Sequence, residues 1–90
     1  AVRRDLALLI DENIEFDTIE RLAKNVLKQA LKEVNLFDVY EGKNLAKGKK
    51  SYGVSFMLQD EKKTLTEKQI DGMMDRLIST FQKELGAELR

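Results

Sequence analysis

The stretch that decides the fold runs LFDVYEGK over residues 36–43 and ends KGKKS over residues 47–51. It predicts a strand, a lysine-rich loop and the start of a second strand. Successive side chains of a strand point to opposite faces. We therefore expect Phe37 and Val39 on one face, and Asp38 and Tyr40 on the other. The second strand continues with an apolar row made of Tyr52, Val54, Phe56 and Leu58.

If the apolar rows of both strands lie on one side of a hairpin, Asp38, Tyr40 and Ser51 gather on the opposite side. That side then carries an acceptor, an aromatic ring and a hydroxyl. The adjoining lysines are Lys43, Lys47, Lys49 and Lys50. A flat ring, hydrogen-bonding groups and nearby cations are what proteins use to hold an unstacked nucleobase. The alternative for Tyr40 is an edge-strand residue that simply favours a sheet.

Composition excludes several kinds of chemistry. Ninety residues without cysteine or histidine make one domain that has no disulfide, no thiolate nucleophile and no histidine-based triad. No apolar run approaches the roughly 20 residues that span a bilayer, and charged residues interrupt any signal-like start. We expect a cytoplasmic domain and, because residue 1 is Ala1 rather than Met, a fragment of a longer chain. The 16 basic and 16 acidic residues balance, so any contact with nucleic acid must come from local clustering.

The other segments supply one strand, two helices and a short final strand. Alternation over 4–10 predicts a first strand whose Leu6, Leu8 and Ile10 share a face. A 3.6-residue stripe from Ile19 to Leu31 then predicts a helix, with Asp17 as its N-cap and Glu20 three residues on.

A second helix is predicted after Leu65. Thr66 and Gln69 have the spacing of a capping box, and Leu65 with Ile70 has that of a hydrophobic staple. Gly86 ends this helix, and 87–90 is long enough for a last short strand.

The order β-α-β-β-α-β with right-handed crossovers predicts an α+β, ferredoxin-like sandwich. Two helices cover one face of a four-stranded antiparallel sheet with strand order 4-1-3-2. On the uncovered face we expect Leu9, Leu36 and Met57, which indicates that this face meets a partner. Gly53 would leave a gap there for a base or a backbone.

Six sequence pieces, in order and along the whole chain, resemble one family. They are RRDLAL at 3–8, LFDVYEG at 36–42, GKKS at 48–51, QD at 59–60, TLT at 64–66 and GAELR at 86–90. This set resembles the ferredoxin-fold anticodon-binding domain at the C-terminus of the bacterial phenylalanyl-tRNA synthetase beta subunit. Two positions depart from the family pattern: Glu41 replaces a common basic residue, and the turn at 13–15 lacks a proline.

The resemblance implies a module that grips the anticodon stem-loop of phenylalanine tRNA and supports aminoacylation in translation. By position, Tyr40 corresponds to the stacking aromatic, and Asp38 and Ser51 to the hydrogen-bonding partners of the first anticodon base. The loop lysines would contact phosphates, which position the RNA rather than specify its sequence. The family also implies other domains of the beta subunit and an alpha subunit as partners, with ATP and Mg²⁺ bound elsewhere in the ligase. We expect no cofactor and no catalytic residue in this domain, and a monomer when it is isolated.

Some alternatives stay open at the level of sequence. The same architecture serves regulatory amino-acid sensors and protein-docking modules, because fold does not fix function. Arg3 and Arg4 suit contact with RNA, pairing with Asp5 or contact with another domain equally well. Adjacent acids at 11–12 and 60–61 are typical of solvated turns.

Overall fold

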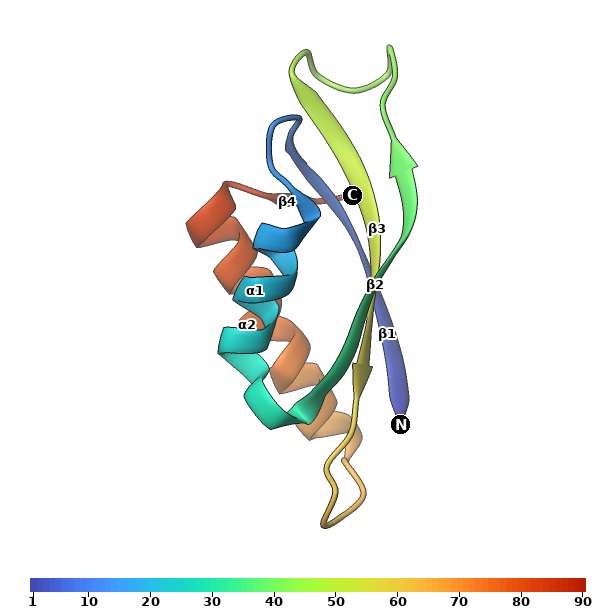
Figure 1. Cartoon of the computed structure of the whole chain (residues 1–90), viewed down its shortest axis with the longest axis vertical. Helices are drawn as coiled ribbons and strands as arrows, with labels where there is room; N and C mark the ends of the chain where they lie inside the picture. The colour runs from blue at the N-terminus through green and yellow to red at the C-terminus, as the bar shows by residue number, and fades with distance from the viewer.

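Four strands and two α-helices follow one another in the predicted order in the computed structural model, which describes residues 1–90 (Figure 1). The elements are β1 (Val2–Asp11), α1 (Phe16–Leu27), a 3₁₀-helix η1 (Lys28–Ala30), β2 (Leu31–Tyr40), β3 (Lys49–Leu58), α2 (Glu67–Leu85) and β4 (Glu88–Leu89). The strands form one antiparallel sheet in the order β2-β3-β1-β4. The predicted ferredoxin-like fold and its strand order are confirmed.

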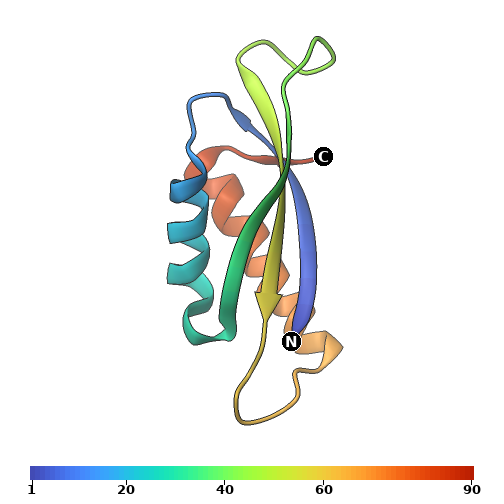
Figure 2. The ribbon, with the colours of Figure 1, turned by 45° about the vertical axis from the view of Figure 1, so that its right-hand side comes forward.

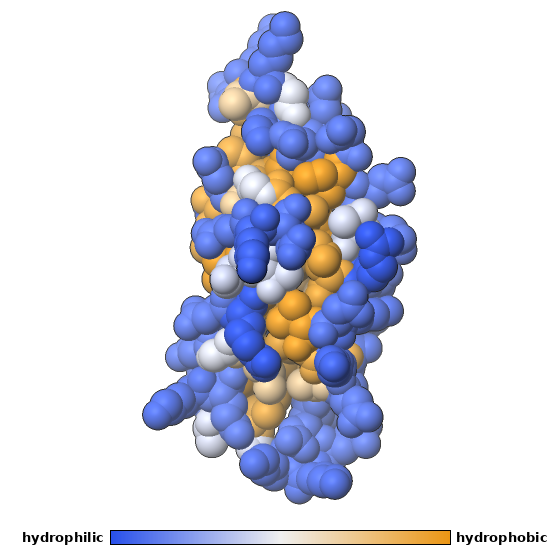
Figure 3. All heavy atoms as spheres, turned by 90° about the vertical axis from the view of Figure 1, so that its left-hand side faces the viewer, coloured by the Kyte–Doolittle hydropathy of each residue, from blue (hydrophilic) through white to orange (hydrophobic).

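Both helices lie on one face of the sheet, and the other face is bare (Figures 1 and 2). The β2–β3 hairpin extends past the ends of the helices, so its loop projects freely from the body of the molecule (Figure 1). Figure 3 looks onto the helical layer, where polar side chains flank a strip of apolar ones. We call the bare side of the sheet the open face.

The core fills the space between the sheet and the helices. It contains 16 buried apolar residues, among them Leu8, Ile10 and Phe56 of the sheet and Leu77 and Phe81 of α2. The rings of Phe56 and Phe81 stack with centroids 6.2 Å apart. Full burial of such side chains contributes roughly 1.5–3 kcal/mol each, so this layer holds the sheet rigid beneath the open face.

The start of α2 is as predicted. The Thr66 side chain accepts a hydrogen bond from the Gln69 backbone N–H at 3.1 Å, and the Gln69 side chain accepts one from the Thr66 backbone at 2.9 Å. Gly86 ends the helix with φ of 62°, in the left-handed region that glycine tolerates best.

The prediction for the ends of α1 was wrong. The helix begins at Phe16 with Glu15 in the N-cap position, and no side chain caps it. Asp17 therefore lies inside the first turn, where its negative charge still favours the helix N-terminus. The helix stops at Leu27, because the chain tightens into η1 and Leu31 already belongs to β2.

Candidate nucleic-acid interface

A β-bulge in β2 arranges the residues of the open face. Leu36 pairs with Val54 and Asp38 pairs with Gly53, so Phe37 is an extra residue in the strand. An extra residue shifts the alternation of the strand by one position. Leu36 consequently packs against the core, while Phe37 and Asp38 both lie opposite Gly53 on the open face.

Two predictions about faces were wrong because of this bulge. Phe37 does not share the core-facing side with Val39; it lies on the open face and is 53% exposed. Leu36 does not lie on the open face. Val39 is on the helical side, opposite Tyr52, yet 51% exposed. The expected gap at Gly53 is filled, since an added Cβ there would stand 2.9 Å from the Phe37 ring.

Asp38, Tyr40 and Ser51 share the open face, as the alternation predicts. Tyr40 pairs directly with Ser51, and Asp38 is two residues away along the strand, opposite Gly53. The Asp38 side chain makes no hydrogen bond or ion pair within the chain, and the residue is exposed. Ser51 is only 4% exposed, so its hydroxyl lies low between its neighbours on the central strand.

Tyr40 has a partner that the sequence analysis missed. The guanidinium carbon of Arg90 lies 5.0 Å from the centroid of the Tyr40 ring. The Arg90 backbone N–H donates to the Ala7 carbonyl at 2.8 Å, which anchors the end of the chain beside β1. No local pattern reveals this contact, because the two residues are 50 positions apart and come from opposite edges of the sheet.

Gly42, two residues after Tyr40, lets the ring lie close to the backbone. A Cβ on Gly42 would lie 2.7 Å from the Tyr40 hydroxyl oxygen. The hydroxyl thus rests against the backbone where the loop begins. The ring is half-buried and held between this backbone and Arg90.

The four lysines do not form one group. Lys43 and Lys47 are exposed in the loop and make no ion pair. The Nζ of Lys49 donates to Asp11 at 2.6 Å, so this charge is already paired. The prediction that Lys50 belongs to the RNA-binding lysines was wrong. Lys50 is 7% exposed, and its Nζ donates to the Tyr52 hydroxyl at 2.9 Å on the helical side.

The loop surface is close to electrically balanced. A shallow hollow at the hairpin tip is lined by Glu12 and Glu41 together with Lys43, Lys47 and Lys49. Because two acids and the Asp11–Lys49 pair offset the lysines, this surface has no strong positive field. Any phosphate contact would rest mainly on the two unpaired loop lysines, Lys43 and Lys47.

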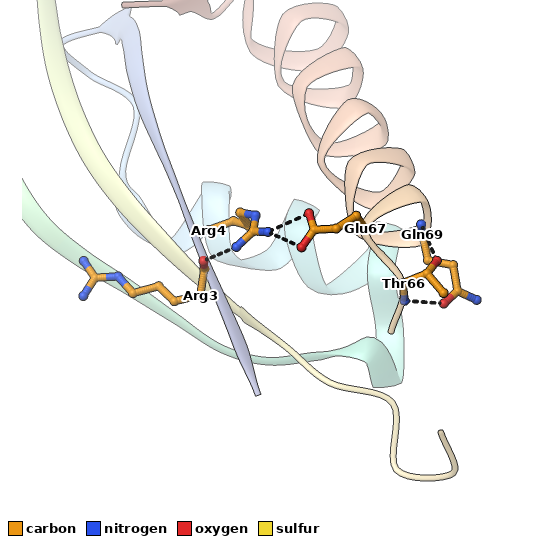
Figure 4. Close-up of polar contacts among 5 residues, drawn as sticks. All are labelled: Arg3, Arg4, Thr66, Glu67 and Gln69. Carbon is orange, nitrogen blue, oxygen red and sulfur yellow. Dashed lines mark hydrogen bonds and ion pairs between the residues drawn. The ribbon is translucent and has the colours of Figure 1, made fainter. Parts of the chain in front are cut away.

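Arg3 and Arg4 point to opposite sides of β1 (Figure 4). Arg4 turns to the helical side and pairs with Glu67 in the first turn of α2 at 3.2 Å. Arg3 lies on the open face, where it pairs with Asp5 at 2.9 Å and places its guanidinium carbon 5.4 Å from the Phe37 ring centroid. Arg4 therefore lies on the helical side, and Arg3 belongs to the open face.

Neither a metal centre nor a membrane span is present among these elements. No group of three or more Asp, Glu, His or Cys side chains is placed to hold a metal ion. No helix has the length and apolar character needed to cross a membrane.

These features define a ferredoxin-like binding module. Its four-stranded sheet is covered by two helices on one face and bears an aromatic ring beside a carboxylate on the other. The family model described as ferredoxin-fold anticodon binding domain matches residues 1–90. The chain belongs to this family.

The most similar relatives include phenylalanine–tRNA ligase beta subunits. The chain is 58% identical to that of Bacteroides fragilis over 90 residues, and 54% identical to that of Porphyromonas gingivalis over 89 residues. The protein of Clostridium acetobutylicum is 43% identical over 89 residues. Each match covers 99% or more of this chain but 11% of the relative, so the chain corresponds to a small part of those proteins.

Proposed function

We propose that this domain binds the anticodon stem-loop of phenylalanine tRNA through its open face, as part of a phenylalanine–tRNA ligase beta subunit. One observation carries the proposal. Tyr40 and Asp38 lie on the bare side of the sheet, next to a projecting loop that bears the unpaired Lys43 and Lys47. Membership in an anticodon-binding family and relatives named as the ligase beta subunit support it.

In the proposed complex, one unpaired base stacks on Tyr40. Stacking on an aromatic ring contributes roughly 1–3 kcal/mol per base. For a base to fit between the Tyr40 ring and a guanidinium, the ring and the guanidinium must be roughly 7 Å apart. The guanidinium carbon of Arg90 is only 5.0 Å from the ring centroid. The Arg90 side chain therefore moves away when a base takes that face, while its backbone stays anchored to Ala7.

Asp38 provides the selection. A carboxylate accepts hydrogen bonds, so it suits the ring N–H and the amino group on the Watson–Crick edge of guanine. Adenine presents an acceptor at the matching ring position, which would face the carboxylate without a hydrogen bond. Ser51 is a minor partner in this proposal, because it is nearly covered.

Phosphate contacts come from Lys43 and Lys47, with a weaker share from Lys49, whose charge is engaged by Asp11. Lys50 is left out of the interface because it is buried against Tyr52. The parent enzyme would carry out amino-acid activation elsewhere, with ATP and Mg²⁺, alongside an alpha subunit.

The test is a titration of the domain with an anticodon stem-loop of phenylalanine tRNA, followed by NMR and by affinity measurement. We expect amide shifts centred on Asp38, Tyr40 and the loop at 41–48. Tyr40→Ala should weaken binding by about 5- to 150-fold, and Tyr40→Phe should retain most of it. Replacing the first anticodon guanine with adenine should weaken binding to the native domain but matter less to Asp38→Asn. Shifts confined to the helical face, or none in low salt, would contradict the proposal.

A further inference from the structure

Phe37 is a second aromatic ring on the open face. The bulge projects it there, and 53% of the residue is exposed, the largest exposed fraction of any large apolar residue in the chain. Its ring edge lies over Gly53, where the absence of a side chain allows the close approach. A fully apolar ring exposed this far contributes little to the core, so a function on the surface accounts for it better.

The surroundings of Phe37 repeat those of Tyr40. The Arg3 guanidinium lies 5.4 Å from the Phe37 ring centroid, as that of Arg90 lies 5.0 Å from Tyr40. Asp5 accepts from two nitrogens of Arg3, at 2.9 and 3.3 Å, in an exposed ion pair. At 5.4 Å from the ring centroid the guanidinium leaves no room for a base between the two, so the Arg3 side chain moves aside when a base takes that face, as Arg90 does at Tyr40. The open face thus presents two ring–guanidinium pairs. Aromatic rings and guanidinium planes are the two groups on which unstacked bases stack.

The spacing of the two rings suits neighbouring bases of a single strand. Tyr40 lies opposite Ser51 and Phe37 opposite Gly53, which is two residues along β3. At the rise of an antiparallel strand this is roughly 7 Å. Stacked bases of a helix are about 3.4 Å apart, so bases on both rings must be splayed rather than stacked on each other.

We propose that Phe37, with Arg3 beside it, is a second stacking site that holds the base next to the one on Tyr40. This inference rests on the proposed function and extends it from one base to two. Phe37 has no hydrogen-bonding group, so the second site is tolerant of base identity. Continuity with the Tyr40 site, two residues away along β3, favours RNA over a protein partner.

The experiment is a double-mutant cycle in which one change is made in the protein and the other in the RNA. Binding of the native domain and of Phe37→Ala is measured on three stem-loops: unmodified, abasic at the first anticodon position, and abasic at the position next to it. Phe37→Leu is the matched control, since it keeps an apolar side chain but removes the plane. Thermal unfolding of each variant checks that the fold is intact.

We expect Phe37→Ala to weaken binding of the unmodified RNA by about 5- to 150-fold, with Phe37→Leu close to it. On RNA that is abasic at the second position the loss should shrink to less than about 2-fold, because the partner of the ring is already gone. On RNA abasic at the first position the full loss should remain.

Four results would overturn the inference. An equal loss on all three RNAs would make Phe37 a general structural residue. Full RNA affinity in Phe37→Ala, with the Tyr40 dependence intact, would remove the second site and leave the proposed function standing. Loss of association with the rest of the beta subunit, at unchanged RNA affinity, would assign Phe37 to protein docking. Failure of the native domain to bind any stem-loop would remove both proposals.

Discussion

A methyl group on Gly53 tests the bulge on which the open face depends. In Gly53→Ala the new Cβ would lie 2.9 Å from Cε1 and Cζ of Phe37 and 3.0 Å from Cβ of Asp38. The Phe37 atoms are the far end of an exposed side chain, which can rotate away. The Cβ of Asp38 is fixed to the backbone, so β2 must shift by a few tenths of an ångström.

The expected cost follows from these contacts. Overpacking at a buried position typically costs about 1–3 kcal/mol. Replacing a strand glycine with alanine returns about 0.5–1 kcal/mol. Because the Phe37 ring can rotate away, we place the cost of overpacking near the middle of its range. The free energy of unfolding should therefore fall by about 1 kcal/mol in total. In a domain of this size that lowers Tm by about 4–8 °C.

Gly72→Ala is the matched control. Gly72 is exposed in the interior of α2, and nothing lies within 4 Å of an added Cβ. The same substitution there should stabilise the domain by about 0.5–1 kcal/mol. Thermal and urea unfolding measure both variants. If Gly53→Ala were as stabilising as Gly72→Ala, Phe37 and Asp38 would not lie over Gly53, and our account of the open face would be refuted.

Three further predictions concern single side chains. Thr66→Ala removes one half of the capping box and should lower the free energy of unfolding by about 1 kcal/mol, measured by urea denaturation. The hydrogen bond and charge of Lys32 lower the pKa of the Glu61 carboxyl, so Lys32→Ala should raise that pKa in an NMR titration. Because the pKa is lowered in the folded state, the pair stabilises the fold above the unfolded pKa, and that contribution is lost as pH falls through the folded one. Lys43→Ala should reduce the slope of log affinity against log salt by about 0.7–0.9, whereas Lys50→Met should lower Tm and leave the slope unchanged.

Local signals predicted most of the fold, because the hydrophobic periodicity of each segment indicates a strand or a helix and the capping and turn residues indicate where it ends. Thr66 with Gln69 marked the start of α2 correctly, since a capping box needs only four consecutive residues. Asp17 has the same spacing to Glu20 but is not a cap, because the chain enters α1 one residue before it. A cap pattern alone does not determine where tertiary packing starts a helix.

The site was predictable only where alternation held without interruption. Asp38 and Tyr40 follow the bulge, so their face relative to Ser51 was predicted correctly. Phe37 was not, because a bulge depends on how two strands pair. Gly53 was the one hint in the sequence. The side of the sheet on which Lys50 lies could have been predicted from the sequence. Lys50 precedes Ser51 in the strand, so its side chain points to the opposite face, toward the helices. It was grouped with the loop lysines because of its charge, although its strand position places it elsewhere.

Contacts between segments that are distant in the chain could not be predicted from the sequence. Arg90 reaches Tyr40, and Arg3 reaches Phe37, only because the sheet brings their strands together. Charge and hydropathy at these positions are ordinary. Ring–guanidinium pairing on the open face is consequently a property of the three-dimensional structure that no window of the sequence contains.

The bulge also resolves a conflict within β2, and this yields a last prediction. Leu36, Asp38 and Tyr40 are spaced by two, so a regular strand would place all three on one face. The extra residue lets Leu36 enter the core while the other two stay on the open face. Deletion of Phe37 should therefore keep both flanking pairs, Leu36 with Val54 and Asp38 with Gly53, as direct neighbours in a regular ladder.

The deletion variant should fold with its register unchanged, visible as cross-strand NMR contacts on both sides of the deleted position. It should keep the stacking of the first base on Tyr40 and lose the contribution of the second base, as Phe37→Ala does. A shifted register, with Leu36 exposed and Tyr40 turned to the helices, would show that the bulge is required for the fold itself. The side chain at 37 would then follow from a structural need rather than from binding.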